Sequence, residues 1–347
     1  MRIFTDISLA PHTTFGIGGP ARWFVEAVSE DDIVEAANWA REKGTELFVL
    51  GGGSNLLVSD AGFNGLVMHV CLKGIERDGE LFRCSAGEDW DGFVTHAVGQ
   101  GYAGIECLAG IPGTIGGTPV QNVGAYGQEV DSVIERVRAF DLERREFVEL
   151  SNTECGFAYR RSRFNTNDRG RFVVTRVDYR LRGNGSPRIS YADLKAHFQD
   201  RAGSATLGEV AGAVRAIRQS KAMLLVEGDP DCRSAGSFFK NPEVSQVAAN
   251  RVREFAERAG VSLRVFPTTD GRVKIPAAWL IEQAGYPKGY AMGAAGISSR
   301  HTLALINRGG AKAEDILALA RRISAAVKER FGIELVMEPA VVGAVDF

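Results

Sequence analysis

The chain has 347 residues, with 41 basic and 43 acidic side chains and a formal net charge of −2 at pH 7. This length exceeds what one hydrophobic core usually supports, so we expect two or three domains. The near-neutral balance gives no global field that would attract nucleic acid or an anionic membrane, so local groups must hold any anionic ligand. No stretch is apolar for long enough to span a membrane, and the first residues lack the apolar core of a signal peptide.

The cysteines indicate the redox environment. They are odd in number and widely spaced, with no CxxC pair: Cys71, Cys84, Cys107, Cys155 and Cys232. This pattern predicts reduced thiols in a cytoplasmic protein, and it argues against a disulfide framework or a zinc site.

The first half of the chain alternates short apolar runs with helical patterns, which is typical of α/β or α+β layers. Ser29 is a predicted N-cap for a helix that stops at Gly44. Residues 47–50 then form a buried strand that runs directly into a glycine cluster. Further along, we expect a helix over 90–99 and strands over 133–140 and 171–181, where β-branched and aromatic residues are enriched.

In the second half, Thr206 and Glu209 form a capping-box pattern that opens a helix ending near Ser220. Turn-forming residues over 227–231 mark a plausible domain boundary. Beyond it, the patterns predict helices near 243–259, 276–284 and 313–330, and a final strand over 333–337.

Two glycine loops are the candidates for binding a ligand. The loop from Gly110 to Gly127 is dense in glycine, which lets backbone N–H groups approach a ligand and form concavities for anions. A structural turn is the alternative. The earlier cluster from Gly51 to Asn55 lacks the Rossmann spacing, because Leu56 stands where the third glycine belongs. A phosphate there would rest on backbone N–H groups and on the side chains of Ser54 and Asn55; a plain tight turn is the other reading.

The two loops, separated by one small subdomain, suit a ligand with a long diphosphate arm, such as a dinucleotide. With them, the chain resembles the FAD-binding domains of the vanillyl-alcohol-oxidase and p-cresol-methylhydroxylase type, in which two α+β subdomains enclose the flavin. No histidine or cysteine lies in the context for covalent attachment, so we expect non-covalent FAD and ordinary packing or surface roles for His12, His69 and His96. The expected FAD contacts are Gly51, Gly52, Gly53, Ser54, Asn55, Ile111, Pro112, Gly113, Gly116, Gly117, Gly124, Ala125 and Tyr126.

The segment over 235–242 places Ser237 between a glycine and two phenylalanines. It either opens a strand or holds a neutral proton donor in a dry pocket. With this segment, the chain resembles the UDP-N-acetylenolpyruvoylglucosamine reductase family over nearly its whole length. The matching motifs occur in the family's order: residues 14–19, the Gly51 loop, residues 111–127, Tyr159-Arg160 with Ser162, the Ser237 segment, residues 279–281 with Gln283, and Glu338-Pro339.

The resemblance implies an NADPH-dependent flavoenzyme that makes UDP-N-acetylmuramate for the bacterial cell wall. The family's catalytic arginine, serine and glutamate match Arg160, Ser237 and Glu338. Hydride from flavin N5 would reach the enolpyruvyl β-carbon, Arg160 would stabilise the charge that develops, and Ser237 would protonate C2. Glu338 would help to orient or polarise the carboxylate. Taken alone, Arg160 reads as part of a solvated basic run and Glu338 as the end of a strand.

The resemblance also implies substrate contacts by Tyr191, Lys221, Asn241 and Gln283. A longer segment between Lys221 and Ser237 departs from the family pattern, so the placement of Lys221 is open. A loop anchor is the alternative for Tyr191.

The expected organisation is an α+β fold with an FAD-binding region over 1–219 and a C-terminal α+β substrate-binding domain over 220–347. The flavin module proper would cover about 16–184, within subdomains over 1–70 and 71–219. We expect UDP-N-acetylenolpyruvoylglucosamine and NADPH as partners, a monomer, and no nucleic acid, membrane or metal. The competing functions are an oxygen-using FAD oxidase of the same fold and an RNA-binding module at residues 159–164.

Overall fold

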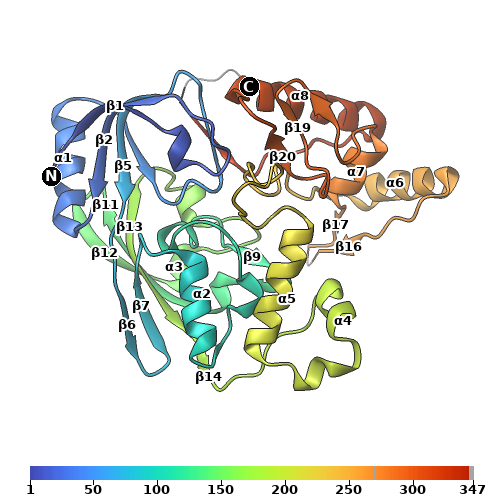
Figure 1. Cartoon of the computed structure of the whole chain (residues 1–347), viewed down its shortest axis with the longest axis horizontal. Helices are drawn as coiled ribbons and strands as arrows, with labels where there is room; N and C mark the ends of the chain where they lie inside the picture. Colours follow the sequence, from blue (N-terminus) through green and yellow to red (C-terminus); the bar gives the residue numbers. More distant parts are fainter. Residues whose placement is uncertain (269, 344–347) are drawn as a thin grey trace. The chain divides into compact units, whose positions relative to one another are not determined.

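The computed structural model describes residues 1–268 and 270–343, and the chain divides into two compact units. The first unit comprises Met1–Ile7, Ala21–Gly53 and Phe63–Ser220, and the second comprises Ser8–Pro20, Ser54–Gly62 and the chain from Lys221 onward. The second unit therefore includes two segments from the N-terminal part of the sequence, coloured blue in Figure 1.

The first sheet of unit 1 has the order β1-β2-β5-β3, and its last three strands are parallel. Its elements are β1 (Phe4–Ser8), β2 (Pro20–Ala27), α1 (Glu30–Glu42), β3 (Leu47–Leu50) and β5 (Phe63–Val70). Ser29 caps α1, as predicted, because its side chain accepts a hydrogen bond from the Asp32 N–H. Buried Ile33 and Ala36 of α1 join the same core as Leu66 and Met68 of β5, so one face of this sheet is sealed by the helix.

The second sheet of unit 1 is antiparallel, in the order β12-β11-β13-β7-β6. Its strands are β6 (Ile75–Asp78), β7 (Leu81–Ser85), β11 (Ile134–Asp141), β12 (Glu146–Ser151) and β13 (Phe172–Arg180). Tyr179 of β13 packs against Trp90 and Phe93, and the three rings form a buried aromatic cluster on one face of the sheet. The Tyr179 hydroxyl lies 2.6 Å from the Thr118 hydroxyl, which anchors the long glycine loop to β13.

The remaining elements of unit 1 are helices and two-stranded ribbons. The helices are α2 (Trp90–Gly99), α3 (Asn152–Cys155), α4 (Ala192–Phe198) and α5 (Leu207–Ser220), with short 3-10 turns η2 (Glu106–Leu108), η3 (Ile115–Gly117), η4 (Val130–Ser132), η5 (Arg163–Asn165) and η6 (Gln199–Ser204). The ribbons pair β8 (Tyr102–Ala103) with β14 (Arg182–Gly183) and β9 (Gly124–Ala125) with β10 (Gln128–Glu129). The capping box of Thr206 and Glu209 at the start of α5 is present, as predicted.

Unit 2 packs helices against small sheets. Its elements are η1 (Ala10–His12), β4 (Leu56–Val58), β15 (Glu243–Val244), α6 (Gln246–Ala259), β16 (Phe266–Pro267), β17 (Val273–Lys274), α7 (Ala277–Gln283), β18 (Ala291–Met292), β19 (Ala295–Ile297), β20 (Leu305–Asn307), α8 (Ala313–Phe331) and β21 (Ala340–Val342). The sheets run β15-β17-β16, β18-β19-β20 and β21-β4, and the last pair is parallel. Ile316 and Ile323 of α8 share the buried core with Leu280 and Phe238.

Long-range hydrogen bonds explain why N-terminal segments fold with unit 2. The Asp60 carboxylate accepts from the N–H of Ala313, at 2.9 Å, and of Glu314, at 3.3 Å, so it caps α8. The Asn307 amide donates to the Phe15 carbonyl at 3.0 Å. No helix among the described residues is long and apolar enough to cross a membrane.

The strand expected over 333–337 is wrong. Within it, only Met337 forms a β-bridge, to Phe239, and the last strand is β21, after Pro339. The apolar residues of the expected strand have different surroundings, because Ile333 is buried in the α8 core whereas Val336 is exposed. An apolar run therefore predicted a strand where the backbone forms only one isolated β-bridge.

Candidate active site

The two glycine loops lie against each other within unit 1. A Cβ added at Gly52 would lie 2.6 Å from Gly113 Cα, and one added at Gly51 would lie 2.9 Å from Thr114 Oγ1. Only glycine allows backbones to approach this closely. Residues some sixty positions apart therefore form one continuous surface, as the prediction of a shared ligand requires.

Thr114 gives a test of whether this surface fits a cofactor. Its hydroxyl is buried and has no hydrogen-bond partner among the described residues. Leaving a buried polar group unsatisfied costs about 1–3 kcal/mol, so such an atom in a native fold requires an explanation. A polar ligand group seated on the Gly52–Gly113 contact would satisfy it. The residues at this junction fit a phosphate-bearing cofactor.

The Arg160 side chain packs against the second half of the long glycine loop. Its guanidinium donates to the Gly124 carbonyl at 2.5 Å and to the Asn122 carbonyl at 3.4 Å, and it lies 3.6 Å from a Glu129 carboxylate oxygen. The Arg160 side chain is 17% exposed, whereas the neighbouring Arg161 is exposed. Arg160 therefore does not belong to a solvated basic run.

Strained backbone accompanies this contact. Arg160, Asn122 and Tyr126 all have positive φ, at 53°, 46° and 48°. Non-glycine residues adopt this conformation at a cost and do so mainly where the surroundings require it, often at functional sites.

Tyr191 also reaches the loop. Its ring contacts the Tyr126 ring edge-on, with centroids 5.4 Å apart, and the Tyr191 side chain is 46% exposed. Tyr191 directly precedes α4, so the structure places this predicted substrate contact beside a predicted cofactor contact.

In unit 2, backbone pairing brings Ser237 close to Glu338. The Glu338 N–H donates to the carbonyl of Phe238 at 2.9 Å, and Phe239 bridges Met337. Both phenylalanines are buried in the core, which fixes the half-buried Ser237 at its edge. The predicted proton donor and glutamate thus lie on paired segments.

The end of the first glycine loop joins the same region of unit 2. The Asn55 amide donates to the Glu338 carbonyl at 3.2 Å, and the Asn55 carbonyl accepts from the Ala340 N–H at 3.0 Å. The Thr14 hydroxyl contacts the carbonyls of Ser54 and Ser234, at 3.3 and 2.6 Å. These contacts connect the Thr14 motif, the first loop and the serine segment.

The other predicted substrate contacts also belong to unit 2. Asn241 accepts from the N–H of Ala277, the first residue of α7, at 2.9 Å, and Gln283 ends that helix. The two therefore lie at opposite ends of α7, about 10 Å apart. Lys221 lies close enough to His301 to influence the charge of its ring.

Comparisons with known proteins agree over both parts of the sequence. Residues 21–150 match the model of an FAD binding domain, and residues 229–342 match that of the UDP-N-acetylenolpyruvoylglucosamine reductase C-terminal domain. The UDP-N-acetylenolpyruvoylglucosamine reductase of Streptomyces coelicolor is 46% identical, and the alignment covers 97% of this chain and 90% of that protein. The chain belongs to the UDP-N-acetylenolpyruvoylglucosamine reductase family.

Two further relatives support this membership. The reductase of Thermobifida fusca is 45% identical, with 97% of each chain covered. The crystal structure of the UDP-N-acetylenolpyruvylglucosamine reductase from Thermus caldophilus matches with a TM-score of 0.67 and 27% identity, covering 99% of this chain and 100% of that one.

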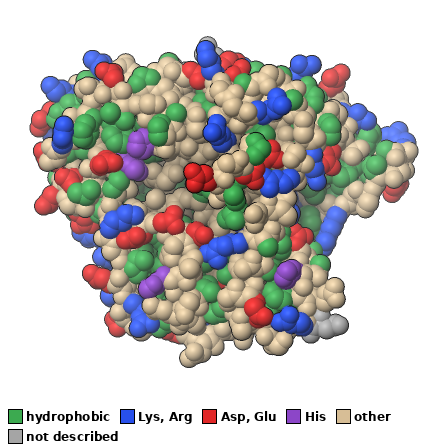
Figure 2. All heavy atoms as spheres, in the orientation of Figure 1, with side chains coloured by type: hydrophobic (Ala, Val, Ile, Leu, Met, Phe, Trp, Pro, Cys, Tyr) green, Lys and Arg blue, Asp and Glu red, His purple; other side chains and the backbone are tan. Residues whose placement is uncertain are grey.

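The family membership confirms several predictions. The α+β fold class, the FAD cofactor and the oxidoreductase class are confirmed. The RNA-binding alternative finds no support, because Phe164 is buried and the Tyr159 ring lies under the Arg160 guanidinium, 5.1 Å from its carbon. Figure 2 also shows acidic and basic side chains interspersed on the face that it draws. The residue assignments and domain boundaries remain predictions.

Sequence reasoning missed Arg218, which lies beside the long glycine loop. Its side chain is 7% exposed, and its Nε donates to the Gly110 carbonyl at 3.0 Å. Burial lowers the pKa of this guanidinium. Arg218 lies four residues after Val214 and therefore on the apolar face of α5. A charged residue at a position where the helical pattern calls for an apolar one could have been noticed in the sequence. A buried cation at this loop suits an anionic ligand.

His301 was also missed, since a lone histidine carries little signal. Burial, followed by the charges of Lys221 and Lys288, lowers the pKa of His301 to about 4. The ring is therefore neutral at pH 7, next to a residue predicted to contact the substrate.

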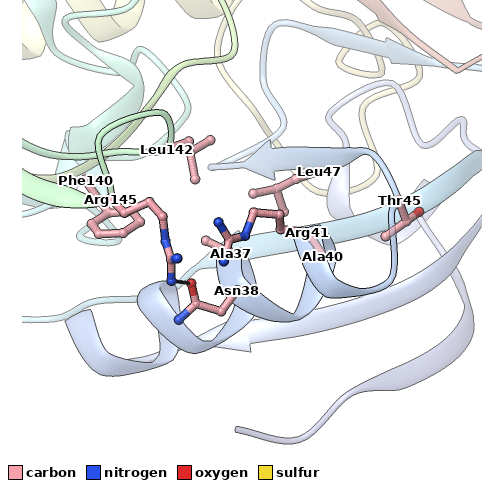
Figure 3. A pocket seen from close by; sticks show the side chains of 9 residues that line it. All are labelled: Ala37, Asn38, Ala40, Arg41, Thr45, Leu47, Phe140, Leu142 and Arg145. Atoms are coloured by element: carbon pink, nitrogen blue, oxygen red, sulfur yellow. Dashed lines mark hydrogen bonds between the residues drawn. The ribbon is translucent and has the colours of Figure 1, made fainter.

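Unit 1 also has a pocket of about 260 Å³ between α1 and the β11–β12 hairpin (Figure 3). Arg145 points into it and donates to Asn38 of α1. Its lining contains none of the predicted site residues: Ala37, Asn38, Ala40, Arg41, Thr45, Leu47, Phe140, Leu142 and Arg145.

Proposed function

We propose that this chain reduces UDP-N-acetylenolpyruvoylglucosamine to UDP-N-acetylmuramate, a precursor of peptidoglycan, with NADPH as the electron donor. The observation that carries the proposal is the end-to-end similarity to relatives named for this reaction. Two features of the chain support it: a glycine surface that fits a phosphate-bearing cofactor, and a serine and a glutamate that lie on paired backbone segments.

Bound FAD would supply the hydride that adds to the enolpyruvyl β-carbon. Negative charge then grows on C2 and its carboxylate, and a guanidinium that is already oriented stabilises that charge without reorganising. Arg160 suits this role because Gly124 and Glu129 hold its side chain in place, and because it is largely buried.

Ser237 would then transfer its hydroxyl proton to C2. An aliphatic hydroxyl is a weak acid, but an enediolate is basic enough to accept its proton, and solvent can later restore it. The buried rings of Phe238 and Phe239 provide an apolar base for this serine. Glu338, on the paired segment, would orient the substrate carboxylate, in a protonated form or through a bridging water.

The remaining assignments concern binding. Lys221 would contact phosphates, Tyr191 is exposed enough to close over the diphosphate, and Asn241 and Gln283 would contact the sugar nucleotide. We further propose that the enzyme is a cytoplasmic monomer. The five free thiols support a reducing compartment.

Anaerobic stopped-flow absorbance tests this proposal. NADPH alone should bleach the flavin, and the enolpyruvyl sugar nucleotide, added afterwards, should restore the oxidised spectrum. A protein purified without flavin, or a reduced flavin that this substrate fails to reoxidise, would overturn the proposal. Substrate-dependent peroxide formation without NADPH would instead identify an oxidase.

A further inference from the structure

Three side chains with metal-ligating atoms meet on one face of the parallel sheet of unit 1. Glu26 of β2 is the register partner of His69 of β5. Cys71 continues the line of β5, and its N–H donates to the Ala27 carbonyl at 2.8 Å. Because side chains alternate along a strand, His69 and Cys71 project to the same side. Strand pairing thus brings together three residues that the sequence separates by up to 45 positions.

The spacing of their polar atoms suits a metal ion. Cys71 Sγ lies 3.3 Å from His69 Nδ1, which lies 3.9 Å from Glu26 Oε1, and all three ligand atoms lie within 4.8 Å of one another. Zinc bonds of about 2.0–2.3 Å in a tetrahedron hold neighbouring ligand atoms roughly 3.3–3.6 Å apart. The Cys71–His69 distance already matches this spacing, and a small rotation of the exposed Glu26 side chain would bring its carboxylate oxygen to the third corner.

The surroundings allow an ion to enter and be held. The side chains of His69 and Glu26 are 21% and 55% exposed, and Cys71 is partly exposed. The four other cysteines are buried. The Phe24 ring lies 6.1 Å from the His69 ring and limits its motion. Solvent can reach the cluster, so a water can complete the coordination.

We propose that Glu26, His69 and Cys71 bind one divalent transition-metal ion of the zinc class. Thiolate, imidazole and carboxylate are a donor set typical of Zn²⁺ and Co²⁺. Cysteine binds such an ion as the thiolate, so metal binding would displace the Cys71 thiol proton. The ion would join β2 to β5 where both strands end and would stabilise unit 1.

The absence of a CxxC pair argued against a zinc site, and the proposed site departs from that expectation. Here two ligands come from a His-x-Cys pair on one strand, and the third comes from a different strand. Only the register of β2 against β5 reveals the set. The site does not depend on the proposed reductase activity.

The test uses the flavin-containing protein, stripped with a chelator and titrated with Co²⁺. One equivalent of Co²⁺ should give the strong absorption of tetrahedral Co²⁺ in the red part of the spectrum, at wavelengths where oxidised flavin does not absorb. Added Zn²⁺ should displace the Co²⁺ and abolish this absorption. Cys71→Ser and His69→Ala should each lose this absorption, whereas the matched control His96→Ala, which removes a histidine of α2, should keep it. Retained absorption in Cys71→Ser, or no saturable binding by the unmodified protein, would overturn the proposal.

A second measurement needs no variant, in case either one fails to fold. Zn²⁺ should slow the alkylation of Cys71 by iodoacetamide at least tenfold, as read by peptide mass, and should raise the melting temperature. Equal alkylation with and without Zn²⁺ would count against the site.

Discussion

The glycine-loop region of unit 1 and the Ser237 region of unit 2 are built in opposite ways. The first depends on missing side chains, because Gly52 and Gly113 come together only without a Cβ. The second depends on side chains held by backbone pairing between segments about one hundred residues apart. Cofactor binding and proton transfer should therefore fail independently. Substitutions in one region should change flavin binding, and those in the other should change the chemistry.

Ser237→Ala should have the largest effect. If Ser237 supplies the proton, its loss should slow reoxidation of the reduced flavin by substrate about 10²- to 10⁴-fold. Reduction of the flavin by NADPH should be nearly unchanged, as should the flavin content. Stopped-flow absorbance measures both half-reactions separately.

Ser245→Ala is the matched control, because Ser245 caps α6 in the same unit. Losing a cap costs about 1 kcal/mol of stability, and both half-reactions should keep their rates. If Ser237→Ala slowed both half-reactions equally, Ser237 would not be the proton donor. The proposed separation of cofactor binding in unit 1 from proton transfer in unit 2 would then be wrong.

Gly52→Ala should affect the other region. The added methyl would lie 2.6 Å from Gly113 Cα, and relieving this overlap between backbones costs about 1–3 kcal/mol. Flavin affinity should therefore fall about 10- to 100-fold, as measured by fluorescence titration of the apoprotein. Gly212→Ala, at an open position within α5, should bind flavin normally and be slightly more stable. Normal flavin affinity in Gly52→Ala would show that the loop contact is only structural.

The sequence predicted local structure better than long-range structure. The α1 and α5 helices were predictable because caps and apolar spacing are local signals. The capping of α8 by Asp60 was not, since the two lie 253 residues apart. The site was predictable to the same extent. The density of glycine indicated the two loops, but that the Thr114 hydroxyl is buried without a partner among the described residues depends on the packing of the folded chain.

His301 offers a test through the pH dependence of stability. Its pKa of about 4 in the fold lies below the ordinary 6.5, so the unfolded chain binds more protons between these values and acid favours unfolding. The stability held above pH 6.5 should fall by about 2 kcal/mol on going to pH 5. His301→Gln should lose less stability over this interval, as measured by denaturant unfolding. Identical pH profiles would show that His301 titrates normally.

Thr114→Val should have the smallest effect and a distinctive sign. Valine keeps the shape of threonine but removes a hydroxyl that has no partner among the described residues, so the apoprotein should be as stable or more stable. If that hydroxyl binds FAD, flavin affinity should fall by about 1 kcal/mol, or roughly fivefold. Differential scanning calorimetry of the apoprotein and fluorescence titration with FAD measure the two changes. Opposite signs would place Thr114 among the cofactor contacts, because a purely structural hydroxyl would change stability and affinity in the same direction.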